Sequence, residues 1–122
     1  MTEEDSIHRV FVYGTLRPRD REGKFLPATH ILHGYSMFNY FNRFPYIEPA
    51  DDTSFVLGNI IEVGDKDLAN LDHYEGVHNN LYHRKRVAVV KTGEKQPQEV
   101  WAYVAGDVSM RVESGDWADV WA

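Results

Sequence analysis

Alternating apolar and polar positions predict short β-strands separated by polar turns. The segment from His8 to Tyr13 alternates β-branched and aromatic residues and stops at Gly14, which is typical of a core strand that runs into a turn. A second run, from Thr29 to Tyr40, consists mostly of β-branched, aromatic and aliphatic residues and is interrupted by Gly34. We expect one long strand there, bent at the glycine.

The rest of the chain predicts four more strands. Turns are expected at Asn42 to Pro45 and at Pro49 to Thr53, with a strand on either side of the second turn, the later one covering Ser54 to Val63. Tyr82 to Lys91 and Glu99 to Ala105 alternate as strands do, and a glycine-containing connector between them suits a hairpin loop.

One short helix is expected between these strands. Asp65 stands where a cap belongs, and Asp67 places negative charge near the positive end of the helix. Leu68 and Leu71 form an apolar pair three residues apart, so they share one helix face. The helix should end near Glu75.

About six short strands with one short helix indicate an α+β protein. Such a pattern favours a closed or nearly closed β-barrel over a doubly wound sheet. The 122 residues, 43% hydrophobic and 26% charged, suit one compact domain covering residues 1–122.

Charge and composition narrow the possible functions. The formal charge of −6 makes nucleic acid an unexpected partner, because the average surface repels phosphates. The chain has no cysteine, so catalysis must use carboxylate, imidazole, hydroxyl or backbone groups. The polar, acidic start from Met1 to Ser6 lacks the layout of a secretion signal, and no apolar run is long enough to span a bilayer. We expect a cytoplasmic protein with no membrane partner, whose oligomeric state the sequence leaves open.

The first candidate site is the turn Tyr13-Gly14-Thr15-Leu16. Where a strand ends beside a glycine, consecutive backbone N–H groups become free to converge on an anion such as a carboxylate. The alternative is that Gly14 merely permits a tight turn. No Gly-Lys-Ser/Thr follows, so the segment is not a phosphate loop.

The second candidate site is the predicted helix end, Leu71-Asp72-His73-Tyr74-Glu75-Gly76. Glu75 is the candidate acid/base group there, provided that neighbouring apolar or aromatic groups raise its pKa towards neutrality by desolvation. The alternative is an ordinary solvated glutamate at a helix end.

The histidines do not predict a metal site. His30 and His33 are three apart on a predicted strand and so point to opposite faces, and the step from His73 to His78 crosses a predicted loop. No serine lies in a Gly-x-Ser-x-Gly elbow. Tyr103 could stack on a ligand, although aromatic residues in a small β-rich domain mostly belong to the core.

Taken together, these segments resemble the γ-glutamylcyclotransferase-like, or AIG2-like, family, and they are closest in pattern to the γ-glutamylamine cyclotransferases. The resemblance rests on five segments that occur in the right order: Val10 to Arg17, Leu71 to Gly76, Tyr82 to Arg84, Val100 to Val104 and Ser114 to Trp117.

The resemblance implies a small mixed β-barrel with a short helix, and an enzyme that needs no cofactor. Its expected substrate is a γ-glutamyl amine or peptide, whose own α-amine attacks the γ-carbonyl to release 5-oxoproline and a free amine. Glu75 is the implied general acid/base, and the amides of Gly14, Thr15 and Leu16 are the implied substrate cradle. Tyr82 and Tyr103 are implied hydroxyl donors to the substrate.

The chain departs from the family after Arg17, where Pro18 to Glu22 replaces a loop that contains glycine and asparagine in many relatives. The leaving amine is therefore not predicted. Two alternatives to a cyclotransferase stay open: a protein that binds a small anionic, amino-acid-like metabolite without reacting with it, and another amide-cleaving activity on the same fold.

Overall fold

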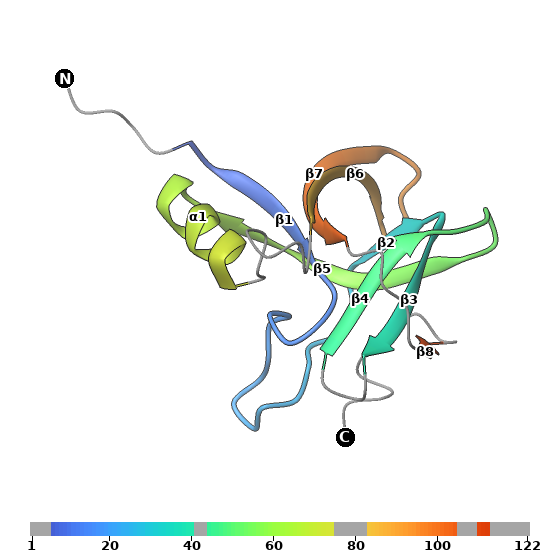
Figure 1. Ribbon diagram of the computed structural model, residues 1–122, viewed down its shortest axis with the longest axis horizontal. Helices are drawn as coiled ribbons and strands as arrows, with labels where there is room; N and C mark the ends of the chain where they lie inside the picture. The colour runs from blue at the N-terminus through green and yellow to red at the C-terminus, as the bar shows by residue number, and fades with distance from the viewer. Residues whose placement is uncertain (1–5, 41–43, 75–82, 105–109, 113–122) are drawn as a thin grey trace.

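The computed structural model describes residues 6–40, 44–74, 83–104 and 110–112 (Figure 1). Its elements in chain order are β1 (His8–Val12), β2 (His30–His33), β3 (Tyr35–Tyr40), β4 (Phe44–Pro49), β5 (Phe55–Val63), α1 (Asp65–Tyr74), β6 (His83–Lys91), β7 (Pro97–Val104) and β8 (Met110–Val112). Five strands close a barrel in the order β1-β5-β2-β6-β7, and the other three form a sheet in the order β4-β3-β8.

The barrel is mixed because β1 and β7 run parallel, paired at Val10 and Trp101, whereas every other neighbouring pair in it is antiparallel. The predicted small mixed barrel with one short helix is therefore confirmed. The described residues hold eight strands rather than about six, since one predicted strand is two and β8 was not expected.

The prediction of one long strand from Thr29 to Tyr40 was wrong. Gly34 has a φ of 81°, a conformation that breaks an extended strand and that glycine adopts readily. Its N–H donates to the carbonyl of Ser54 (2.9 Å), and its carbonyl accepts the N–H of Ala50 (2.8 Å). The chain consequently leaves the barrel after β2 and enters the second sheet as β3.

The turn expected at Asn42 to Pro45 was also misplaced. Phe44 and Pro45 already belong to β4, where Phe44 pairs with Tyr40 and Pro45 with Asn39. Residues 41–43 lie outside the described part of the chain.

Strand β1 is buried on both faces, which explains its run of large apolar residues. Phe11 packs in one core cluster with Val56, Val89 and other barrel residues. On the opposite face, Val10 packs with Leu68 of α1 in a second cluster. Helix α1 thus covers the outside of the barrel along β1 (Figure 1).

Helix α1 covers Asp65–Tyr74 and so starts at the residue that was expected to cap it. Its first turn is closed by the Leu68 N–H, which donates to the carbonyl of Gly64 at 2.9 Å. The Asp65 carboxylate contacts the ring of His8 and accepts the backbone N–H of Ser6 at 3.4 Å. Hydrogen bonding by His8 and by the Ser6 amide lowers the pKa of Asp65. Within the described residues, no helix is long and apolar enough to span a membrane.

A series of side-chain hydrogen bonds joins His30 on β2 to residues of β1 and β7. Arg9 donates to the amide oxygen of Gln98, the Gln98 amide nitrogen lies 3.4 Å from Nε2 of His30, and Nδ1 of His30 lies 2.8 Å from the Thr29 hydroxyl. With Gln98 donating, Nε2 must accept, so the arrangement fits a neutral imidazole. Burial first, and then the positive charges of Arg9 and Lys91, lower the pKa of His30 from 6.5, while Glu94 opposes them.

The lowered pKa of His30 predicts that the free energy of unfolding decreases in mild acid. Because folding lowers the pKa of His30, the unfolded chain binds more protons than the folded protein when the pH lies below 6.5. The free energy of unfolding therefore decreases as the pH falls from 6.5 towards the pKa that His30 has in the folded protein. Guanidinium unfolding at pH 7.5 and at pH 5.5 measures this loss. His30→Gln should show a smaller loss than the wild type, whereas the exposed neighbour variant His33→Gln should match the wild type. Equal losses in all three proteins would contradict the assignment.

Candidate functional site

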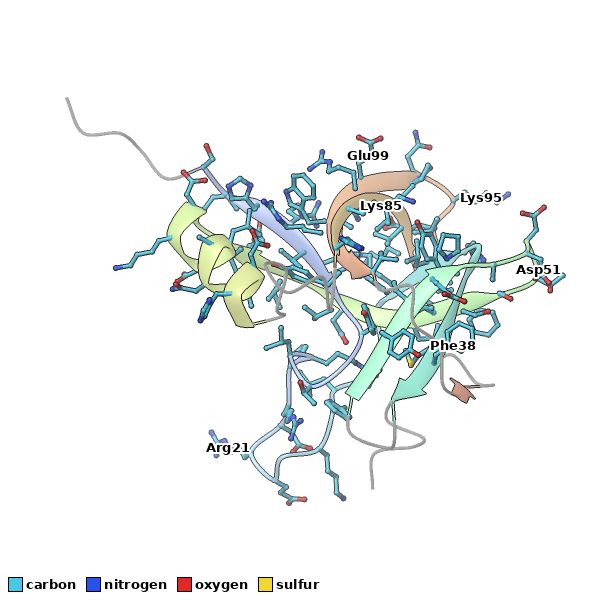
Figure 2. All side chains as sticks on the ribbon, in the orientation of Figure 1. Arg21, Phe38, Asp51, Lys85, Lys95 and Glu99 are labelled. Carbon is cyan, nitrogen blue, oxygen red and sulfur yellow. The ribbon has the colours of Figure 1, made fainter. Side chains whose placement is uncertain are left out.

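The candidate turn starts where two parallel strands end. Because β1 and β7 run in the same direction, their carboxyl ends meet at one edge of the barrel, which Tyr13 and Val104 mark. The turn follows at once and is closed by the N–H of Arg17, which donates to the carbonyl of Gly14 at 3.0 Å. The loop that continues from it reaches away from the barrel, with Arg21 near its far end (Figure 2).

Gly14 is required by a close approach rather than by a turn with positive φ. A Cβ atom at this position would lie 2.6 Å from Cγ of Pro45, well inside contact distance. The turn is therefore packed directly against β4. Within the part of the chain that the structure describes, the N–H groups of Thr15 and Leu16 have no hydrogen-bond acceptor.

A chain of two hydrogen bonds links this turn to the end of α1. The Tyr13 hydroxyl donates to the backbone carbonyl of Tyr103 (2.5 Å), and the Tyr103 hydroxyl donates to Oδ1 of Asp72 (2.7 Å). Both tyrosines are buried. The first candidate segment and the helix of the second are thus joined through one residue of β7.

Asp72 also forms an ion pair with β6. Nε of Arg84 lies 2.9 Å from the same Oδ1 atom that accepts the Tyr103 hydroxyl. The Arg84 guanidinium lies over the ring of Trp101, 4.4 Å from its centroid. Arg86 approaches the same ring at 5.0 Å, but its carboxylate partner is Glu99 at 3.8 Å.

Arg17 is a buried cation that joins the end of the turn to two neighbouring segments of the chain. It is 3% exposed, its Nε donates to Oδ1 of Asn59, and its Nη2 donates to the carbonyl of Leu26, both at 2.9 Å. Its guanidinium also lies over the Phe25 ring, 5.1 Å from the centroid. In the sequence, Arg17 stands out only as the last residue of the opening segment, and Asn59 does not stand out. The one available signal was that a charged residue directly follows an apolar strand and turn.

The predicted site residues are only partly described. Tyr13, Gly14, Thr15 and Leu16 lie together at the barrel edge, and Tyr103 joins them through its hydrogen bonds. The predictions for Glu75 and Tyr82 fall outside the described residues. The hydroxyl hydrogen of Tyr103 is directed to Asp72, so its present hydrogen bond positions the helix.

His30 and His33 face opposite sides of β2, one buried and one exposed. Among the residues that the structure describes, no group of three or more histidine, aspartate or glutamate side chains is arranged to hold a metal ion.

Comparison with known proteins adds a family likeness over nearly the whole chain. Residues 10–119 match the family described as gamma-glutamyl cyclotransferase, AIG2-like. A protein of Methanocaldococcus jannaschii, provisionally named as a gamma-glutamylcyclotransferase, is 34% identical over 118 residues, which cover 90% of this chain and 95% of that protein. The AIG2 C protein of Arabidopsis thaliana is 36% identical over 114 residues, which cover 85% of this chain and 66% of that protein.

Solved structures share the fold. The solution structure of an Arabidopsis thaliana protein superposes with a TM-score of 0.66 at 27% identity, covering 84% of this chain and 71% of that one. An AIG2-like protein of Mus musculus superposes with a TM-score of 0.60 at 20% identity, covering 82% of this chain and 78% of that one. The second likeness is one of fold alone.

Proposed function

The chain belongs to the AIG2-like gamma-glutamyl cyclotransferase family and is a cyclotransferase-like enzyme, and we propose that it converts a γ-glutamyl amine or peptide into 5-oxoproline and a free amine. The observation that carries the proposal is the pair of hydrogen bonds from Tyr13 through Tyr103 to Asp72. This link supports a site in which the turn after β1 and the end of α1 act on one substrate.

The proposed reaction is an intramolecular acyl transfer. The α-amino nitrogen of the substrate attacks the γ-carbonyl carbon, a new C–N bond closes the five-membered ring, and the bond from that carbon to the leaving nitrogen breaks. Nucleophile and electrophile belong to one molecule, so the protein has to hold a reactive conformer. Orientation of this kind is worth on the order of 7 kcal/mol or more.

Glu75 is the proposed acid/base group. As a carboxylate it takes a proton from the α-ammonium group and frees the nucleophile; as a carboxylic acid it returns that proton to the departing nitrogen, so its own charge is restored after each turnover. The second proton that the attacking nitrogen loses on becoming the ring N–H leaves with the product amine, which is released as an ammonium ion. It follows Tyr74, the last residue of α1, directly in the sequence.

The amides of Thr15 and Leu16, together with that of Gly14, are the proposed cradle for a substrate oxygen. Support comes from the two N–H groups that have no acceptor within the described residues, because such donors stabilise a carboxylate or a developing oxyanion. Tyr13 acts in this proposal by holding the start of the turn against β7 rather than by touching the substrate. Tyr82 remains the proposed hydroxyl donor to the substrate, whereas the Tyr103 hydroxyl, whose hydrogen is directed to Asp72, is proposed to accept a hydrogen bond from it.

A panel of γ-glutamyl compounds tests the proposal. The purified protein should release 5-oxoproline and the corresponding amine in equal amounts from at least one γ-glutamyl amine or γ-glutamyl peptide, as measured by mass spectrometry. The matching α-glutamyl compounds are the control and should stay intact, because their side-chain carboxylate offers no amide for the α-amine to attack.

Labelled water separates the alternatives. Cyclisation leaves no solvent oxygen in the product, whereas hydrolysis in H₂¹⁸O places ¹⁸O in released glutamate. Released glutamate that carries the label would replace the cyclotransferase proposal with another amide-cleaving reaction. Compounds that bind but remain intact would favour a binding protein.

A further inference from the structure

Asp72 lies at a junction between one helix and two strands. A single oxygen atom, Oδ1, accepts the hydroxyl of Tyr103 on β7 at 2.7 Å and pairs with Nε of Arg84 on β6 at 2.9 Å. The side chains are 19% exposed for Asp72 and 27% for Arg84. At this partial burial, removing either partner leaves the other charge shielded from water and unpaired, which costs more than breaking an ion pair in open solvent.

The direction of Arg84 is fixed by Trp101. The guanidinium lies over the ring at 4.4 Å, and Trp101 itself packs in the core cluster that contains Leu68 and Leu71 of the helix. A planar guanidinium stacked on an aromatic face keeps its N–H edge free to point at a carboxylate. The ring thus directs Arg84 towards the end of α1.

From these contacts we propose that Asp72 and Arg84 are positioning residues that hold the last turn of α1, from which the chain continues directly to Glu75. Asp72 is three residues before Glu75, and consecutive Cα atoms are about 3.8 Å apart. The start of the helix is held separately, by the contact between the Asp65 carboxylate and the ring of His8. The inference rests on the proposed role of Glu75 as the acid/base group and adds which side chains hold the helix end that precedes it.

Amide hydrogen exchange of the free protein tests, without any substrate, whether Asp72 and Arg84 hold the last turn of α1. Asp72→Asn, which keeps the shape of the side chain, and Arg84→Gln should each speed exchange at the amides of residues 72–74 by about tenfold or more. Two control variants should leave those amides unchanged: Asp67→Asn in the first turn of the same helix, and Arg86→Gln beside the same tryptophan ring.

Steady-state kinetics on the best substrate of the panel tests the consequence. Each of Asp72→Asn and Arg84→Gln should lower kcat by roughly 10- to 100-fold, since small misplacements of a reacting group cost that much, and should leave KM within about threefold. The double variant should lose no more than about threefold beyond the worse single variant, because residues of one network are not additive. Arg84→Lys, which retains the charge, should recover part of the loss.

The outcomes separate this inference from the proposed function. An active wild type whose two variants show unchanged exchange or unchanged kcat would overturn the positioning role while leaving the cyclotransferase intact. Equal losses of kcat in Arg86→Gln would also overturn it, by pointing to a general effect of positive charge near Trp101. A wild type that is silent on the whole panel would remove the proposed function itself, and the positioning role with it.

Discussion

Replacing Glu75 by glutamine should lower kcat by about 100- to 10 000-fold, the range expected when a positioned general acid/base group is removed. Glutamine has nearly the same shape but neither accepts a proton from the α-ammonium group nor returns one to the leaving nitrogen. The rate of 5-oxoproline release from the best γ-glutamyl substrate measures the effect.

Substrate binding should survive in the Glu75→Gln variant. The substrate is proposed to be held by the amides of Gly14 to Leu16, which this change does not touch, so its dissociation constant should stay within a few-fold of the wild-type value. Glu75→Asp, which keeps the carboxyl group but shortens the side chain, should fall between the two proteins. A carboxylate variant elsewhere on the same helix, Asp67→Asn, is the matched control and should retain full activity.

Undiminished turnover in Glu75→Gln would remove the proposed mechanism. The fold would be unaffected by that result, because the barrel and its family likeness do not depend on the role of one residue. Loss of activity together with a lowered melting temperature would instead assign Glu75 to stability. The melting temperatures of Glu75→Gln and Glu75→Asp therefore have to be measured together with their kinetics.

The fold was readable from the sequence wherever local pattern decides structure. Alternation marked β1, β6 and β7, and the acidic residues and leucine pair marked α1, because these features depend on near neighbours. The break at Gly34 was not readable, since β-branched and aromatic residues continue on both sides of it. What decides there is a positive φ held by hydrogen bonds to Ser54 and Ala50, which are distant in sequence.

The candidate site was predictable as segments but not as contacts. The turn after β1 and the helix end could be picked out because each combines glycine or acidic residues with the end of an element. The pairing of Arg84 with Asp72, and of Arg17 with Asn59, depends on strand register and on how α1 lies against the barrel. Sequence separation of 42 residues between Arg17 and Asn59 leaves no local pattern from which to infer such a bond.

The largest expected effect on stability comes from Gly58→Ala on β5. A Cβ atom at Gly58 would lie 2.4 Å from the carbonyl oxygen of Val12 and 2.7 Å from the ring of Phe11. Phe11 is 1% exposed, so its ring has no solvent to move into, and the carbonyl belongs to the backbone of β1. We expect a loss of about 2 kcal/mol or more in the free energy of unfolding, at the upper end of overpacking changes.

Two further variants test whether contact with the backbone is the cause. Ala88→Val adds volume at an exposed position of β6 and should change stability by less than about 0.5 kcal/mol. Gly58→Ala should cost about as much in a Phe11→Leu background as in the wild type, because Phe11→Leu removes the ring contact but not the contact with the Val12 carbonyl. A cost that disappears in the Phe11→Leu background would place the clash on the ring alone. Wild-type stability of Gly58→Ala itself, measured by denaturant unfolding, would contradict the close approach of β1 and β5 on which the position of the turn after β1 depends.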